Sequence, residues 1–200
     1  MRKSVWMPIA ALLLAAALLF AGYNGLNGVR AARDEAELLS KMQTILPGSE
    51  VFVQEEYTGE DANIQAVYKG ETGYVIRTQT YGYAGNITML IGVSNAGKVT
   101  GLQVRDMQET FGLGAQALTD WEFLAQFLNT QGNVAIGSPD QTDAFSSASG
   151  TTESAEGEQT YVDAITGATV TSKAIARSIN SAVGFVTGAD ASSEATSWGG

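Results

Sequence analysis

The sequence contains no cysteine and no histidine, and only three of its 200 residues are proline. Without thiolates or imidazoles the chain cannot form cysteine or histidine metal sites, attach haem or iron–sulfur clusters, or use a histidine-based acid–base relay. Most of the usual catalytic groups are therefore excluded. The absence of cysteine leaves the redox compartment open, because a protein without disulfides can fold in any compartment.

Positive charge is also scarce. Eleven Lys and Arg stand against 21 Asp and Glu, which gives a formal net charge of −10. The acidic excess lies downstream, because three of the cations, Arg2, Lys3 and Arg30, flank the first apolar run. An acidic domain repels polyanions, so we expect no nucleic-acid partner.

An apolar run without charged residues extends from Val5 to Tyr23. At a rise of about 1.5 Å per residue, a helix of this length reaches roughly the 30 Å of a bilayer core. Residues 1–4, with their two cations, are then expected in the cytoplasm, and the rest of the chain outside the cell membrane. A cleaved secretory signal also fits. The length of the run favours a single-pass transmembrane anchor, and both alternatives place the domain on the extracytoplasmic side.

Residues 31–187 have the pattern of one α+β domain with an antiparallel sheet flanked by helices. Apolar residues at helical spacing predict a helix over 34–46, ended by Pro47 and Gly48. A short strand is expected at 51–57. Four more strands follow, and the short Gly- or Asn-containing links between them are typical of antiparallel hairpins. These strands are expected at 63–70, 73–83, 86–94 and 98–107.

Two helices are expected to flank this meander. The first begins after Thr119 or Asp120 as N-cap. Its expected buried residues are Trp121, Leu124, Phe127 and Leu128. Amphipathic spacing predicts the second helix over 171–186. Residues 131–160 are polar and are predicted to form a surface loop, and residues 188–200 a disordered tail.

The string Asp-Ala-Ile-Thr-Gly-Ala-Thr occupies residues 163–169, at the start of the last predicted helix. Threonine in such a place commonly caps free backbone amides, and Thr169 or Thr171 could each serve as the cap. The whole string is more specific, because it resembles the Asp-x-x-Ser/Thr-Gly-Ala-Thr motif of proteins that carry FMN covalently. The resemblance implies a phosphoester between FMN and the hydroxyl of Thr169.

The residues around this threonine suit a phosphate group. Gly167 and Ala168 leave space beside the backbone, and the following helix presents free N–H groups and its positive dipole end. Lys173, one turn into the helix, can add a charged contact. The expected cofactor-binding residues here are Thr166, Gly167, Ala168, Thr171, Ser172 and Lys173. The resemblance implies that a Mg²⁺-dependent flavin transferase forms the bond from FAD and recognises Asp163.

A second segment agrees with this interpretation. Residues 82–85 are Gly-Tyr-Ala-Gly, and residues 107–114 are Met-Gln-Glu-Thr-Phe-Gly-Leu-Gly. They resemble the Gly-Tyr-Gly-Gly and His-x-Glu-Thr-Pro-Gly-Leu-Gly motifs of the FMN-binding domain in the G subunit of the Rnf complex and the C subunit of the sodium-pumping NADH:quinone oxidoreductase. Met107 and Phe111 depart from the His and Pro of that pattern. The matching residues, expected to contact FMN, are Glu109, Thr110, Gly112, Leu113 and Gly114.

Chain size, one predicted anchor and an outward-facing domain favour the Rnf G subunit within this family. The resemblance implies a membrane-anchored electron-transfer subunit with covalent FMN. Its partners are then the other membrane subunits of a complex that links ferredoxin oxidation to NAD⁺ reduction and to Na⁺ or H⁺ movement. In such a protein the cofactor carries the chemistry, which explains the missing Cys and His.

Other functions stay open at this point. The chain could be the C subunit of the quinone reductase, or a stand-alone flavinylated electron shuttle. It could also be a membrane-anchored, non-redox binding module, in which the Thr-Gly-Ala-Thr string only caps a helix and Glu109 is solvated. Tyr81 and Tyr83, which we consider for packing against the flavin ring, are then ordinary strand residues. A hydrolase is least favoured, because only a Ser/Lys arrangement with Lys173 remains.

Overall fold

The computed structural model describes residues 33–109, 114–137 and 160–188. The chain divides after Lys41 into two compact units. In the described part of the first unit, residues 33–41 are helical, and Lys41 pairs with Glu37 one turn earlier.

The helical stretch as a whole covers residues 33–45, close to the predicted 34–46. Gly48, with φ of +85°, follows in a conformation that favours glycine. None of the helices within the described ranges has both the length and the apolar character needed to span a bilayer. The predicted anchor at 5–23 lies outside those ranges.

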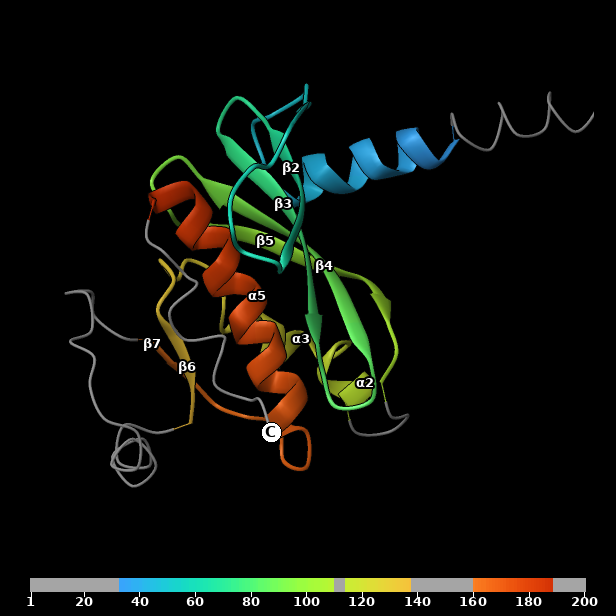
Figure 1. Ribbon diagram of the computed structural model, residues 1–200, viewed down its shortest axis with the longest axis vertical. Helices are drawn as coiled ribbons and strands as arrows, with labels where there is room; N and C mark the ends of the chain where they lie inside the picture. The colour runs from blue at the N-terminus through green and yellow to red at the C-terminus, as the bar shows by residue number, and fades with distance from the viewer. Residues whose placement is uncertain (1–32, 110–113, 138–159, 189–200) are drawn as a thin grey trace, which may run out of the picture. The chain divides into compact units, whose positions relative to one another are not determined.

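A five-stranded antiparallel sheet, in the order β1-β2-β3-β4-β5, forms the base of the second unit (Figure 1). Its strands are β1 Val53–Glu55, β2 Ile64–Lys69, β3 Gly73–Tyr81, β4 Asn86–Ser94 and β5 Val99–Met107. The predicted meander is therefore confirmed. Strand β1 is shorter than the predicted 51–57, because only the three residues Val53–Glu55 pair with β2.

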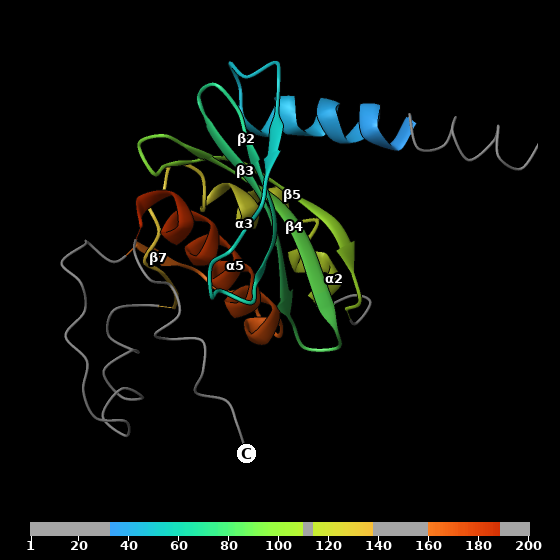
Figure 2. The ribbon, with the colours of Figure 1, turned by 45° about the horizontal axis from the view of Figure 1, so that its top comes forward.

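A long helix, α5 Thr169–Thr187, lies across one face of this sheet (Figures 1 and 2). Two short helices, α2 Gly114–Ala117 and α3 Trp121–Ala125, come between β5 and the rest of the chain. Strands β6 Val134–Ile136 and β7 Thr160–Val162 form a parallel pair next to α5, on its side away from the sheet (Figure 1). The second unit is thus layered as sheet, helix and strand pair.

The strand pair was not expected. Residues 131–160 are predicted to be a polar loop, yet the apolar segment Val134–Ile136 forms β6, and Thr160 begins β7. Val134 and Val162 are both buried in the core, and the burial of these side chains favours the pairing of the two short strands. Residues 138–159 of the predicted loop, and the predicted tail after residue 188, lie outside the described residues.

The prediction for α3 is right about its cap and wrong about one side chain. Asp120 is the N-cap, and its carboxylate accepts the N–H groups of Glu122 and Phe123. Trp121, predicted to be buried, is 66% exposed. It lies two positions before Phe123, or about 200° around a helix of 3.6 residues per turn, so it points outward when Phe123 points inward. The fully or largely buried residues of this segment are Phe123, Leu124 and Phe127.

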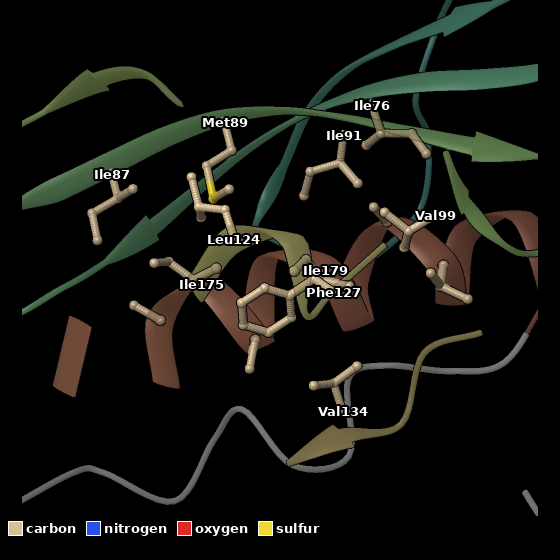
Figure 3. Packing of buried hydrophobic residues seen from close by; sticks show 14 of the residues in the cluster. Ile76, Ile87, Met89, Ile91, Val99, Leu124, Phe127, Val134, Ile175 and Ile179 are labelled. Carbon is tan, nitrogen blue, oxygen red and sulfur yellow. The ribbon is translucent and has the colours of Figure 1, made fainter. Parts of the chain in front are cut away.

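One continuous core lies between the sheet and α5. Met89 and Ile91 of β4 point toward Ile175 and Ile179 of α5, with the ring of Phe127 beside them (Figure 3). All five side chains are completely buried. Val134 of β6 closes the far side of this core (Figure 3).

Polar contacts fix α5 along its length. The hydroxyl of Thr80 in β3 donates to the Ala174 carbonyl at 3.1 Å and lies 2.9 Å from the Ser178 hydroxyl. On the opposite side, the Asn180 side chain exchanges two hydrogen bonds with the backbone of Val134, at 2.9 and 3.0 Å. Because α5 is held from both sides, its first residue, Thr169, has a fixed position relative to the sheet.

Candidate functional site

The site begins at the first turn of α5. Thr169 is the first helical residue, and its side chain is exposed. The N-cap residue is Ala168, no side chain of the described residues caps the helix, and its first turn contains no acidic residue. The interpretation of Thr169 or Thr171 as a helix cap is therefore wrong. Within the described ranges, the N-terminus of this 19-residue helix keeps its positive dipole end uncompensated by side chains.

The turn that leads into α5 is held by Ser172. Its buried hydroxyl donates to the Ala168 carbonyl at 3.0 Å and accepts the Ile165 N–H at 3.4 Å. Gly167, with φ of +81°, takes the left-handed conformation that the turn requires. Ser172, predicted to bind the cofactor, thus uses its hydroxyl to fix the backbone around Thr169.

Thr171 has an unusual environment. It is 1% exposed, and within the described residues its Oγ1 has no hydrogen-bond partner. A buried hydroxyl without a partner costs about 1–3 kcal/mol, so such groups are uncommon in native proteins. The structure therefore has a donor and acceptor here that a further group can satisfy.

Gly114 brings Thr171 together with the second predicted motif. A Cβ atom on Gly114 would lie 2.7 Å from Thr171 Oγ1 and 2.6 Å from Glu109 Oε2, closer than real Cβ atoms approach. Only glycine at this first residue of α2 therefore lets the backbone pass this close to the hydroxyl and the carboxylate. Residues 110–113, which include the predicted Thr110, Gly112 and Leu113, lie outside the described residues.

Glu109 holds a turn of the sheet. Its Oε1 accepts the Tyr83 N–H at 2.7 Å, and its Oε2 accepts the Ala84 N–H at 3.4 Å. The interpretation of Glu109 as a solvated side chain is therefore wrong. The carboxylate connects the end of β5 to the turn between β3 and β4, two segments that both lie at the end of the sheet where α5 begins (Figures 1 and 2).

The remaining predicted residues are placed at the surface. Thr166 and Lys173 are exposed, and so is Asp163, whose N–H donates to the Gln126 side chain at 3.1 Å. Tyr81 and Tyr83 are 63% and 69% exposed. Tyr81 is the last residue of β3, as expected of a strand residue, whereas Tyr83 lies in the turn after it.

Sequence reasoning missed Arg177. Its Nη2 donates to the Tyr81 carbonyl at 3.1 Å, which ties α5 to the end of β3. Arg177 lies one helical turn after Lys173 and two turns after Thr169, on the same stripe of α5. That spacing is the signal from which it could have been found.

Gly82→Ala tests the contact between Glu109 and the turn. A Cβ on Gly82 would overlap Glu109 Oε1, so we expect the carboxylate to lose its hydrogen bond from the Tyr83 N–H. The free energy of unfolding should fall by about 1–3 kcal/mol, as measured by chemical denaturation. In a Glu109→Ala background the same substitution should cost less, because only the close contact with Ile87 Cδ1 then remains. Equal costs in the two backgrounds would contradict the assigned contact.

Comparison with known proteins gives the family. The sequence model of the FMN-binding domain family matches residues 82–184, which is just over half of the chain. The chain belongs to the FMN-binding domain family. The matched range contains Glu109, Gly114, Thr169 and Thr171, so it covers the site described above.

Curated relatives are G subunits of ion-translocating complexes. The chain is 32% identical over 185 residues to the G subunit of the ion-translocating oxidoreductase complex of Methanosarcina acetivorans, covering 86% of this chain and 87% of the relative. It is 33% identical to the G subunit of the Na⁺-translocating ferredoxin:NAD⁺ oxidoreductase complex of Acetobacterium woodii, over 56% of this chain. The proton-translocating ferredoxin:NAD⁺ oxidoreductase complex of Clostridium ljungdahlii has a G subunit that is 32% identical over 57% of this chain. The resemblance to the Rnf G subunit is confirmed.

The extent of these matches differs. The chain spans about half the length of the Acetobacterium and Clostridium relatives, 47% and 53% respectively. Among solved structures, the C subunit of the Na⁺-translocating NADH-quinone reductase from Parabacteroides distasonis has a TM-score of 0.48 and 22% identity, over 76% of this chain and 81% of that one.

Proposed function

We propose that the chain is an electron-transfer subunit of an Rnf-type complex, anchored in the cell membrane by residues 5–23, with FMN attached to Thr169 through a phosphoester. The family membership and the relatives from ion-translocating complexes support the flavin and the complex. The site described above supports the attachment point.

One observation carries the assignment to this end of α5. Thr171 is a buried hydroxyl without a partner in the described residues, and the backbone of Gly114 lies close beside it. We propose that a cofactor attached to the exposed Thr169, at the same end of the helix, supplies the missing hydrogen bond. The residues present therefore fit FMN.

The start of α5 is suited to the phosphate of the cofactor. The free N–H groups of its first turn and the helix dipole both favour an anion next to Thr169. Lys173 is exposed one turn further on the same stripe and adds a positive charge. Gly167 and Ser172 act indirectly, because they fix the backbone that presents the Thr169 hydroxyl.

Glu109 and Tyr83 serve the opposite end of the cofactor. Because the Glu109 carboxylate is engaged by the Tyr83 and Ala84 N–H groups, its role is to hold the turn in place. That turn presents the exposed ring of Tyr83 at the same end of the sheet as Thr169, where it can pack against an aromatic cofactor. Glu109 is thus a positioning residue.

Attachment requires one group transfer at Thr169. The Thr169 oxygen bonds to the phosphorus of the FMN half of FAD, the phosphoanhydride bond breaks, AMP leaves, and the hydroxyl proton is lost. A separate flavin transferase catalyses this step, with Asp163 at the exposed surface as part of its recognition sequence. Once attached, FMN supplies the electron-transfer chemistry, for which the chain itself has no Cys or His.

The wider complex is inferred from the relatives. Their names describe ferredoxin:NAD⁺ oxidoreductases that translocate Na⁺ in one organism and protons in another. We propose that this chain works with membrane subunits of a complex of that kind, with its domain outside the cytoplasm. The family membership and the relatives favour this function over a non-redox binding module.

Intact-mass measurement on the chain purified from its own host tests the proposal. The expected mass exceeds that of the polypeptide by one FMN less one water, and peptide mapping should place the addition on Thr169. An unmodified mass, or an addition on another residue, would overturn the assignment.

A further inference from the structure

A polar cleft of about 360 Å³ opens on the face of the sheet that α5 does not cover. Its lining residues come from the four strands β2 to β5: Gln65, Arg77, Gln79, Thr88, Arg105 and Asp106. In β3, Arg77 and Gln79 alternate with Ile76 and Thr80, and Thr80 contacts α5. The cleft is therefore separate from the site around Thr169.

Two β-bulges shape this cleft, one on each flank. In β5 the register shifts so that Asp106 pairs with Thr88 and Val104 pairs with Met89, which leaves Arg105 as the extra residue. A bulge puts two consecutive side chains on one face, and here it puts Arg105 beside Asp106 in the cleft. In β2 the corresponding shift between Ile64 and Ala66 leaves Gln65 as the extra residue.

The two arginines of the cleft are free to bind a partner. Among the described residues, neither Arg77 nor Arg105 forms a hydrogen bond or an ion pair through its side chain, not even with Asp106. This is notable in a chain with 21 acidic and only 11 basic residues, in which acidic partners are plentiful. The cleft carries a formal charge of +1 on an otherwise acidic protein.

From these features we propose that the cleft binds a short acidic segment of another protein. The planar guanidinium group pairs with carboxylates in a two-point geometry, which suits Arg77 and Arg105. The side chains of Gln65, Gln79 and Thr88 can exchange hydrogen bonds with the backbone of an extended segment. The cleft is an open trough across four strands, so a small ion bound there would stay largely in water. Sites for small ligands bury most of their ligand, so a longer occupant suits the cleft better. A nucleic acid extends far beyond the cleft, so most of its phosphates would face the acidic remainder of the chain and be repelled.

A fluorescein-labelled oligoglutamate peptide is the probe, with the 200-residue chain in neutral detergent and fluorescence anisotropy as the measurement. Oligoglutamine of equal length is the control peptide. We expect Arg77→Gln and Arg105→Gln each to weaken oligoglutamate binding about tenfold, because each removes a charged hydrogen bond. Lys98→Gln, which removes an exposed cation outside the cleft, should leave binding within about twofold, since distant surface charges are screened.

The outcomes are separable. No binding of oligoglutamate, equal loss in Lys98→Gln, or displacement of the peptide by inorganic phosphate at the same concentration would each overturn the proposal. Arg105 is exposed on the edge strand β5, so we expect the Arg105→Gln variant to fold. This variant therefore tests the proposal even if Arg77→Gln fails to fold. Thr169→Val should bind the peptide as the unaltered chain does, because this proposal does not depend on the flavin.

Discussion

Thr169→Val is expected to abolish covalent flavin completely. When the chain is produced together with a flavin transferase, the unaltered protein should show flavin fluorescence in a denaturing gel, and the variant should show none. Valine has nearly the shape of threonine but no oxygen to esterify. Because Thr169 is exposed at the start of α5, the substitution should change the free energy of unfolding by no more than about 0.5 kcal/mol.

Two matched variants sharpen this result. Thr166→Val removes an exposed hydroxyl three residues earlier in the same motif and should retain the flavin. Thr169→Ser keeps the oxygen and should restore at least part of the labelling. Fluorescence of undiminished strength in Thr169→Val would show that the flavin is attached elsewhere.

Thr171→Val is expected to act in opposite directions on two properties. The hydroxyl is buried without a partner in the described residues, so its removal should raise the free energy of unfolding of the flavin-free chain by about 1–3 kcal/mol. The same change removes a hydrogen bond that we propose for the attached cofactor. Flavin incorporation by the transferase should slow by about tenfold. Chemical denaturation and the time course of gel fluorescence measure the two effects.

The chain offers a control for each effect. Thr130 is also buried, but its hydroxyl donates to the Phe127 carbonyl at 2.7 Å, so Thr130→Val should lower stability by about 1 kcal/mol. Thr78 is a buried hydroxyl without a partner among the described residues, so Thr78→Val should raise stability and leave flavin incorporation unchanged. If Thr171→Val destabilises the flavin-free chain, the proposed role of this hydroxyl is wrong.

The sheet could be predicted from the sequence because its order is local. Strands β2 to β5 are consecutive, and each is joined to the next by a short link rich in glycine or asparagine. Such links determine pairing and register over a few residues. The last helix was predictable for a similar reason, since the spacing of Ile175 and Ile179 follows from the helical repeat alone.

Contacts between distant segments could not be predicted. The pairing of β6 with β7 joins residues separated by a long polar stretch, and neither three-residue strand has a recognisable period. The bonds from Glu109 to the backbone of Tyr83 and Ala84 cross 25 or 26 positions. The motifs drew attention to Glu109 and Thr171, but only the fold brings both side chains close to Gly114. The fold also shows that the Glu109 carboxylate is hydrogen-bonded, whereas the Thr171 hydroxyl has no partner within the described ranges.

The attachment of α5 on both sides has a consequence for electron delivery. Thr169 begins a helix that is hydrogen-bonded to β3 through Thr80 and to β6 through Asn180, so its backbone provides little motion of its own. A flavin attached there, as we propose, would swing only through the torsions of its ribityl phosphate arm. Under that proposal, the redox centres that exchange electrons with the flavin would have to come to it. The docking of neighbouring proteins, rather than travel of the cofactor, would then select donor and acceptor.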